Sequence, residues 1–156
     1  LLCLISSGAV FAQDITHTIT CDIQNVAEIK FKPGAPQVTT YSFTTADDYE
    51  NNVANNNGAN LQVASNTDWT INVRAGSSNF SYSGPHTDPN MPSTVLKVRN
   101  RPASRINLLD SDAEIATGSP GNFTDNEVQL RYIAVPKFDY PDGTYTIDVI
   151  YTLTNS

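Results

Sequence analysis

Positive charge and catalytic side chains are both scarce in this chain of 156 residues. It carries nine Lys plus Arg against sixteen Asp plus Glu, for a net charge of −7. Surfaces that bind nucleic acid or anionic lipid need clustered positive charge. The sequence has no basic run, only a small basic patch formed by Lys97, Arg99, Arg101 and Arg105. We therefore expect no nucleic-acid partner.

The chain also lacks the residue groupings that enzymes use. Its two His, His17 and His86, have no neighbours that complete a zinc site or a nucleophile–base pair. Two acidic runs remain, at residues 47–50 and 110–114. Their alternating carboxylates either hold Ca²⁺ or form solvated loops. The sequence predicts no enzyme and no cofactor, with calcium as the alternative.

Only the start of the chain is apolar enough to suggest a targeting segment. Val10 and Ala12 stand at the positions where signal peptidase accepts small residues or Val, which places a cut before Gln13. We expect residues 1–12 to be a signal peptide, or else a retained apolar leader, and residues 13–156 to be one domain. No other segment is long enough to span a bilayer. The protein is expected at the cell surface.

Cysteine is nearly absent from the expected mature chain. Cys3 lies in the leader, which leaves Cys21 and no internal disulfide. Cys21 is expected to be a small buried side chain in a strand. The alternative is a disulfide between two chains.

What the chain does have is alternation of apolar and polar residues with a period of two. Strands are expected at residues 14–23, 27–32, 38–43, 61–65, 69–75, 94–98, 106–109, 128–134 and 144–154. The strands at 61–65 and 69–75 are expected to form a hairpin, and the Asn-rich residues 51–58 an exposed loop. Thr45 and Asp48 predict a capped helical turn. The fold predicted is an all-β, Ig-like or jelly-roll sandwich of about eight to nine short strands.

The first expected strand has a second interpretation. Ile15, His17, Ile19, Cys21 and Ile23 share one face. Such a strand is typical of the edge of a sandwich, where His17 would be a structural residue. It also resembles the N-terminal strand that bacterial pilins donate to the next subunit, in which alternate side chains fill the pockets of a missing strand.

Two other segments, residues 61–73 and 143–154, resemble the WxL family of bacterial surface domains. That resemblance implies a β-sandwich involved in cell-wall attachment. Trp69-Thr70-Ile71 has Ile where the first motif has Leu, and Tyr151-Thr152-Leu153 has Tyr where the second has Trp. Half of the family's paired Trp motif is therefore altered.

Four aromatic residues in expected loops are candidates for binding sugar: Phe80, Tyr82, Phe138 and Tyr140. Their rings either stack on a glycan or tuck under the loops to close the end of the sandwich.

Together these features predict an extracellular, non-enzymatic structural subunit of a bacterial surface fibre. Its partner would be itself, in a homopolymer built by β-strand exchange. The alternative function is a monomeric WxL-like module that binds cell-wall or other glycan.

Overall fold

The computed structural model describes residue 13 and residues 15–155, so the predicted leader and Asp14 lie outside the described residues. The strands are β1 (Ala27–Phe31), β2 (Val53–Ser65), β3 (Trp69–Ala75), β4 (Ser81–Ser83), β5 (Leu96–Asn100), β6 (Ile106–Asn107), β7 (Ala113–Gly118), β8 (Glu127–Ala134), β9 (Thr144–Thr146) and β10 (Val149–Asn155). A short helix, α1 (Ala46–Asn51), and a 3₁₀ turn, η1 (Ser93–Val95), are the helical elements of this part of the chain. The all-β prediction is confirmed.

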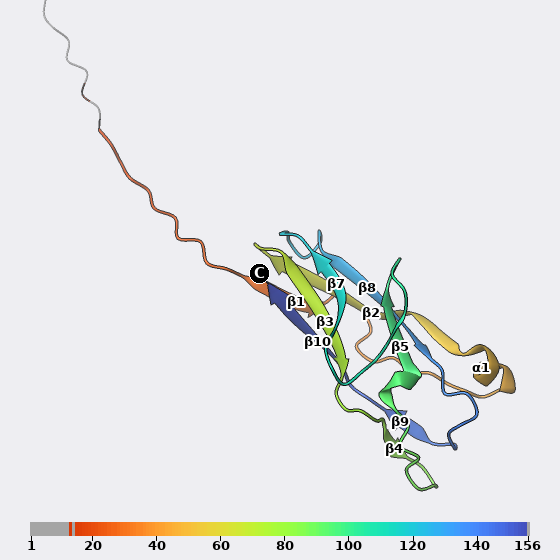
Figure 1. The fold of residues 1–156 in the computed structure, drawn as a ribbon. Coiled ribbons are helices and arrows are strands. Elements are labelled where there is room, and N and C mark those ends of the chain that lie inside the picture. The colour runs from red at the N-terminus through yellow and green to blue at the C-terminus, as the bar shows by residue number, and fades with distance from the viewer. Residues whose placement is uncertain (1–12, 14, 156) are drawn as a thin grey trace, which may run out of the picture.

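The strands form two antiparallel sheets packed face to face (Figure 1). One sheet has five strands in the order β1-β2-β8-β5-β6, and the other has three in the order β10-β3-β7. An Ig-type sandwich sets strands A, B, E and D against strands C, F and G. Across the five-stranded sheet, β1, β2, β8 and β5 take the positions of A, B, E and D. In the other sheet, β3 and β10 take the positions of C and F. β4 and β9 pair separately at one end.

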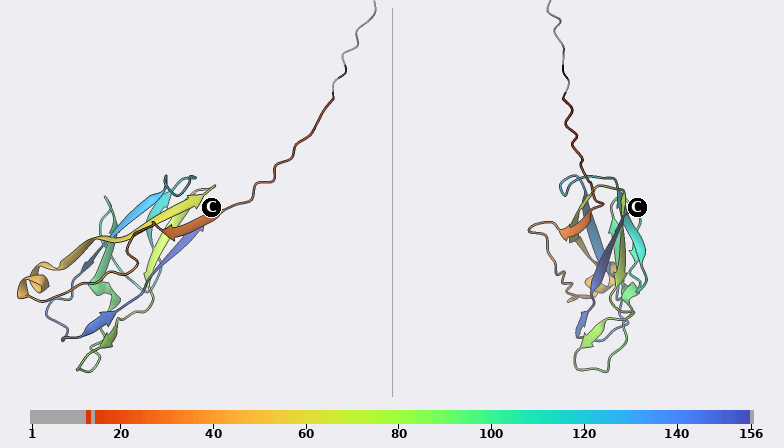
Figure 2. Two further views of the ribbon diagram at one scale, coloured as in Figure 1. Left: turned by 180° about the vertical axis from the view of Figure 1, so that it is seen from behind. Right: turned by 90° about the vertical axis from the view of Figure 1, so that its left-hand side faces the viewer.

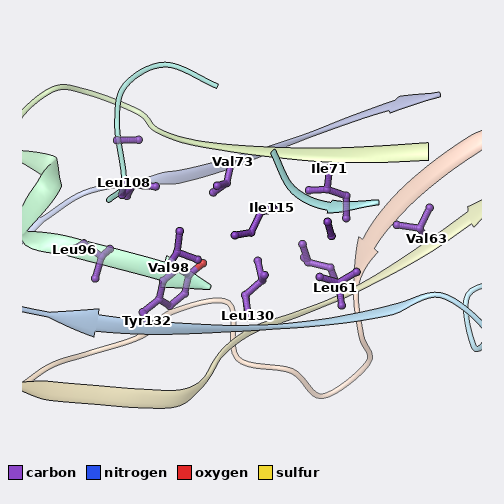
Figure 3. Close-up of a cluster of buried hydrophobic side chains, with 14 of the residues drawn as sticks. Leu61, Val63, Ile71, Val73, Leu96, Val98, Leu108, Ile115, Leu130 and Tyr132 are labelled. Carbon is purple, nitrogen blue, oxygen red and sulfur yellow. The ribbon is translucent and has the colours of Figure 1, made fainter. Parts of the chain in front are cut away.

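Alternating apolar residues build the core between these sheets. On β3, every second side chain from Trp69 to Ala75 is buried, and β8 alternates in the same way. The largest fully buried side chains come from both sheets and from the loop after β6: Leu61, Ile71, Leu108, Leu130, Val63, Val73 and Val98 (Figure 3). Burying each such side chain contributes about 1.5–3 kcal/mol.

Two expectations about the region before β3 are wrong. Residues 38–43 form no strand, and Tyr41 and Phe43 instead pack from a loop against the core. The Asn-rich residues 51–58 are not a loop, because β2 begins at Val53 and pairs with β8 across a register shift between Asn55 and Ala59. The polar composition of residues 51–58 gives no apolar alternation from which their pairing with β8 could be predicted.

Two expectations about connections are also wrong. The residues between Ser65 and Trp69 carry the chain from the five-stranded to the three-stranded sheet, so β2 and β3 form no hairpin. The last predicted strand is interrupted at Ile147 and Asp148: β9 pairs with β4, whereas β10 pairs with β3.

The capped turn is confirmed. The Thr45 backbone N–H donates to Asp48 Oδ2 at 2.8 Å, and the Asp48 N–H donates to Thr45 Oγ1 at 3.3 Å, which together form a capping box at the start of α1. In the described part of the chain, no helix is long and apolar enough to cross a membrane.

Candidate functional site

Residues 15–26 form a tail that belongs to no strand. Every side chain of this tail is exposed, and the tail runs away from the sandwich in both orientations (Figures 1 and 2). Ile15, Ile19 and Ile23 have exposed fractions of 91%, 78% and 81%. The expectation that this segment is a half-buried strand of its own domain is therefore wrong for residues 15–23. Its second interpretation, a strand for another subunit, stays a prediction.

His17 and Cys21 lie between these isoleucines and are exposed as well. His17 is therefore not a buried structural residue, and Cys21 is a free, exposed thiol rather than a buried one. Both expectations failed because they assumed that the tail pairs within its own chain.

Polar side chains tie the root of the tail to the sandwich. Asn66 accepts a hydrogen bond from the backbone N–H of Val26 at 2.9 Å and donates one to the carbonyl of Gln24 at 2.8 Å. Asn155, at the end of β10, donates to the side chain of Asn25 at 2.7 Å. The tail therefore leaves the domain from a defined position beside the end of β10.

β10 is an edge strand. It pairs with β3 on one side, and among the described residues no strand pairs with its other side. β1 is the edge of the five-stranded sheet, and the two edges meet where the rings of Phe31 and Tyr151 lie edge to face, with centroids 6.4 Å apart. In an Ig-type sandwich, strand G occupies the position next to strand F. That position corresponds to the unpaired side of β10.

The apolar side chains along this side of the sandwich are only half-buried. We call this set the open edge: Ile29 and Phe31 of β1, and Val149, Tyr151 and Leu153 of β10. By contrast, Ile71 and Val73, which lie opposite Leu153 and Tyr151 in the β3–β10 register, are almost completely buried. The core is therefore incompletely covered where strand G would lie. Partial burial is also enough to raise the pKa of the Tyr151 phenol.

Three of the four aromatic candidates lie in packed positions. Phe80 packs against the core. Tyr82 and Tyr140 both contact Tyr145, at centroid distances of 5.0 and 6.3 Å. The Tyr82 hydroxyl also donates to the carbonyl of Asp142 at 2.9 Å. This arrangement closes the β4–β9 end of the sandwich.

Phe138 is different from the other three. Its exposed fraction is 66%, and its ring stacks on that of Tyr49 at 5.1 Å and 21°. Tyr49 in turn contacts Phe43 at 5.2 Å. Phe138 is the aromatic candidate with the most exposed ring.

Trp69 of the first WxL-like motif is a core residue. It is buried, and its Nε1 donates to the carbonyl of Ser119 at 3.0 Å. A Cβ on Gly118 would overlap its indole ring. The Trp69 ring is therefore packed mainly against the protein itself, while Tyr151 of the second motif lies in the open edge.

A carboxylate of each acidic run interacts with other groups of the protein. Asp48 caps α1, and Asp112 lies 3.6 Å from Arg74. Within the described residues, no group of three or more His, Cys, Asp or Glu is placed to hold a metal ion. Calcium binding stays a prediction.

One group of side chains was only partly visible in the sequence. Arg131 of β8 lies directly opposite Arg99 of β5. The basic patch therefore includes an arginine that is distant from the others in the sequence. The strand register, which period-two patterns do not specify, is what brings these arginines together.

No protein-family model matches the chain, and no curated protein matches it either. Among solved structures, the chain is similar to one from a chaperone-usher pilus, described in relation to the molecular basis of rod uncoiling. The similarity covers 95% of this chain and 100% of that chain, with 11% sequence identity and a TM-score of 0.47. At these values the likeness carries no argument about function.

Proposed function

We propose that this protein is an extracellular, structural rather than enzymatic, subunit of a bacterial surface fibre. In the fibre, the tail of one copy would pair with β10 of another copy and cover its open edge. The observation that carries the proposal is the match within one chain between an exposed apolar tail and a half-buried apolar edge.

The chemistry of strand addition fits both partners. The unpaired side of β10 offers backbone N–H and C=O groups to an added strand. Ile15, Ile19 and Ile23 are four residues apart, so in an extended strand their side chains share one face and repeat about every 13 Å. Burying the three isoleucines contributes roughly 5–9 kcal/mol before the cost of ordering the tail.

The geometry of the tail favours exchange between copies over pairing within one copy. The tail is tied to Asn66 and Asn155 at its root and points away from the sandwich (Figure 2). Pairing with its own β10 would require the chain to reverse direction immediately after that root. Because the donated and accepting surfaces differ, the contact is heterologous, and it builds a filament where successive copies do not close into a ring.

The direct test uses the double variant Ile19→Asp, Ile23→Asp. The fibre subunit is expected to lose polymerisation, measured by sedimentation and negative-stain microscopy, while its near-UV circular dichroism is unchanged because both side chains are exposed. The matched control is Thr18→Asp, Thr20→Asp, which places the same charges on the opposite face and should still polymerise.

A second measurement probes the acceptor. A synthetic peptide of residues 13–26 is expected to bind the Ile19→Asp, Ile23→Asp variant and to shorten wild-type fibres. The proposal fails if the double variant still polymerises in about 1 M NaCl, where contacts between charged surfaces are screened, or if the wild-type chain stays monomeric at every concentration.

A glycan-binding module is the second candidate function, and the exposed Phe138 ring favours it. Such a module is expected to stay monomeric and to co-sediment with cell-wall sacculi. Phe138→Ala would abolish that binding without changing stability, because the ring is largely exposed. Equal binding by Phe138→Ala would count against this candidate.

A further inference from the structure

Positive charge is concentrated in one region of this acidic molecule. Of the nine Lys and Arg in the chain, four are Arg99, Arg101, Arg105 and Arg131, which we call the arginine cluster. Residues 97–109 contain no Asp or Glu. Outside the cluster, sixteen acidic residues face five basic ones (nine minus four). The cluster is therefore a local exception to the charge of the whole protein.

The strand register places these arginines side by side. Arg99 of β5 lies opposite Arg131 of β8. On the other side of β5, Val98 pairs with Ile106 of β6, so Arg105 comes next to Arg99. Val98 and Leu130 point into the core, which places Arg99 and Arg131 on the outer face of the five-stranded sheet. Like charges directly opposite each other destabilise a sheet.

The electrostatics of Arg99 reflect this crowding. Its pKa is lowered, first by desolvation and then by the positive charges of Arg105, Arg101 and Arg131. The ion pairs found between described residues join Lys32 to Glu127, Arg74 to Asp112 and His86 to Asp142. None of the three includes Arg99, Arg101 or Arg105. An anion from outside the chain would relieve the repulsion.

Side chains of the opposite charge lie on and beside the three-stranded sheet, with Glu114 on β7 and the others in the loops that lead into β7 and β10. We call this set the acidic patch: Asp110, Asp112, Glu114 and Asp148, all exposed. Asn72 of β3 lies between the buried Ile71 and Val73, so its side chain points outward. Glu114 of β7 pairs with Asn72 and points outward as well. Asp148 lies beside Gly76 on the same face. Arg74 lies among them and pairs with Asp112.

We infer that the arginine cluster of one copy docks against the acidic patch of a second copy, as a side-by-side contact distinct from strand exchange. The inference rests on the proposed assembly of identical subunits and adds a second interface to it. Because the two patches lie on the outer faces of opposite sheets, each docked copy keeps one patch free. The contact is therefore heterologous.

Charge distribution favours a second copy over a polyanionic glycan as the occupant. Outside the cluster the chain carries sixteen acidic residues and five basic ones, so a polyanionic glycan longer than the cluster would meet an excess of negative charge. A second copy presents carboxylates to the arginine cluster: Asp110, Glu114 and Asp148, together with Asp112, which is paired with Arg74. At physiological ionic strength the Debye length is about 8 Å, so facing patches attract while more distant charges are largely screened.

The test uses the full-length Ile19→Asp, Ile23→Asp chain, which lacks strand exchange, so that failure of this contact is distinguishable from failure of the fibre. By sedimentation velocity, its average mass is expected to rise with concentration at low salt. It should return to that of the monomer in about 1 M NaCl, where the Debye length is about 3 Å.

Charge reversals in the same background identify the surfaces. Arg99→Glu with Arg105→Glu, and separately Asp110→Lys with Glu114→Lys, should each weaken association at least tenfold. The four changes combined leave both surfaces near neutral and should not restore association. The inference is overturned if the background chain stays monomeric at low salt, or if either pair of reversals leaves association unchanged.

A separate measurement tests the alternative that the arginine cluster binds a polyanionic glycan. Heparin is the polyanion used as the probe. If Arg99→Glu with Arg105→Glu abolishes heparin binding while Asp110→Lys with Glu114→Lys leaves self-association unchanged, the cluster binds polyanions and docking between copies is wrong.

Discussion

At the residue scale, the packing of the Trp69 ring requires a glycine at position 118. The indole ring occupies the space that a Cβ on Gly118 would need, and its Nε1 is held by the carbonyl of Ser119. Gly118→Ala is expected to destabilise the protein by about 1–3 kcal/mol through overpacking. Urea denaturation monitored by Trp fluorescence measures this effect.

The control for that substitution is Thr117→Ala, an exposed neighbour on the same strand. A change within about 0.5 kcal/mol is expected there. If Gly118→Ala were equally neutral, the ring of Trp69 would have room to move, and its assignment as a fixed core residue would be wrong.

Asp48 makes the start of α1 sensitive to acid. Its carboxylate accepts hydrogen bonds from the backbone N–H groups of Thr44 and Thr45, each at 2.8 Å, and from the Thr45 hydroxyl at 2.9 Å. The bond from Thr44 is the largest cause of its lowered pKa. A lowered carboxyl pKa stabilises the fold above the unfolded value of about 3.8, and this contribution is lost as pH falls through the folded value.

Asp48→Asn is therefore expected to lower the melting temperature near neutral pH by about 2–4 °C. The difference from wild type should disappear in strong acid, as a thermal-denaturation series from neutral pH to pH 2 would measure. Glu50→Gln removes the same charge from the same helix without removing the cap and should have little effect. A difference that persists in acid would contradict the role of the Asp48 carboxylate.

At the scale of elements, the unpaired side of β10 has a measurable consequence. In an edge strand, half of the backbone N–H groups point away from the neighbouring strand. Residues 149–155 are therefore expected to exchange amide hydrogens faster than β3 in the monomer and to become protected in the fibre. Hydrogen exchange read by mass spectrometry tests this, with residues 69–75 as the internal control.

β3 lies between β10 and β7, so its amides should be protected in both states. Equal protection of residues 149–155 in monomer and fibre would mean that β10 is not the acceptor. A different edge strand would then have to take the tail.

The strands that the sequence predicted well are those with strict alternation and one buried face, above all β3 and β8. The period-two pattern reports burial rather than pairing, and this explains the failures. The pattern found the end of β2 at residues 61–65 but missed its beginning around Asn55, because residues paired across a register shift need not alternate. At residues 38–43 it predicted a strand, because Tyr41 and Phe43 anchor a loop to the core at alternate positions.

At the scale of the whole molecule, the sequence showed the apolar face of the N-terminal segment but not the open edge of the sandwich. The open edge combines β1 with β10, which lie at opposite ends of the described chain. Similarly, Arg131 joins the arginine cluster only through the register of β8 with β5. Both surfaces are products of topology, which local patterns in one sequence do not specify.

Cys21 offers a probe of the assembled state, because it lies between Ile19 and Ile23 on the same face of an extended tail. In the monomer its thiol is exposed and free, so it is expected to react rapidly with a maleimide. In the proposed fibre, the face that carries the isoleucines would be turned toward the open edge of the next copy. Labelling of Cys21 in a Cys3→Ala chain should therefore slow at least tenfold on assembly.

The matched control moves the thiol by one residue, in the variant Cys3→Ala, Cys21→Ala, Asp22→Cys. Successive side chains of a strand point to opposite faces, so the thiol at position 22 should stay reactive in the fibre. Protection at both positions would indicate general burial of the tail, and protection at neither would mean that the tail stays free in the assembly. Only protection at position 21 alone fits a strand inserted with its isoleucines facing the half-buried residues of β1 and β10.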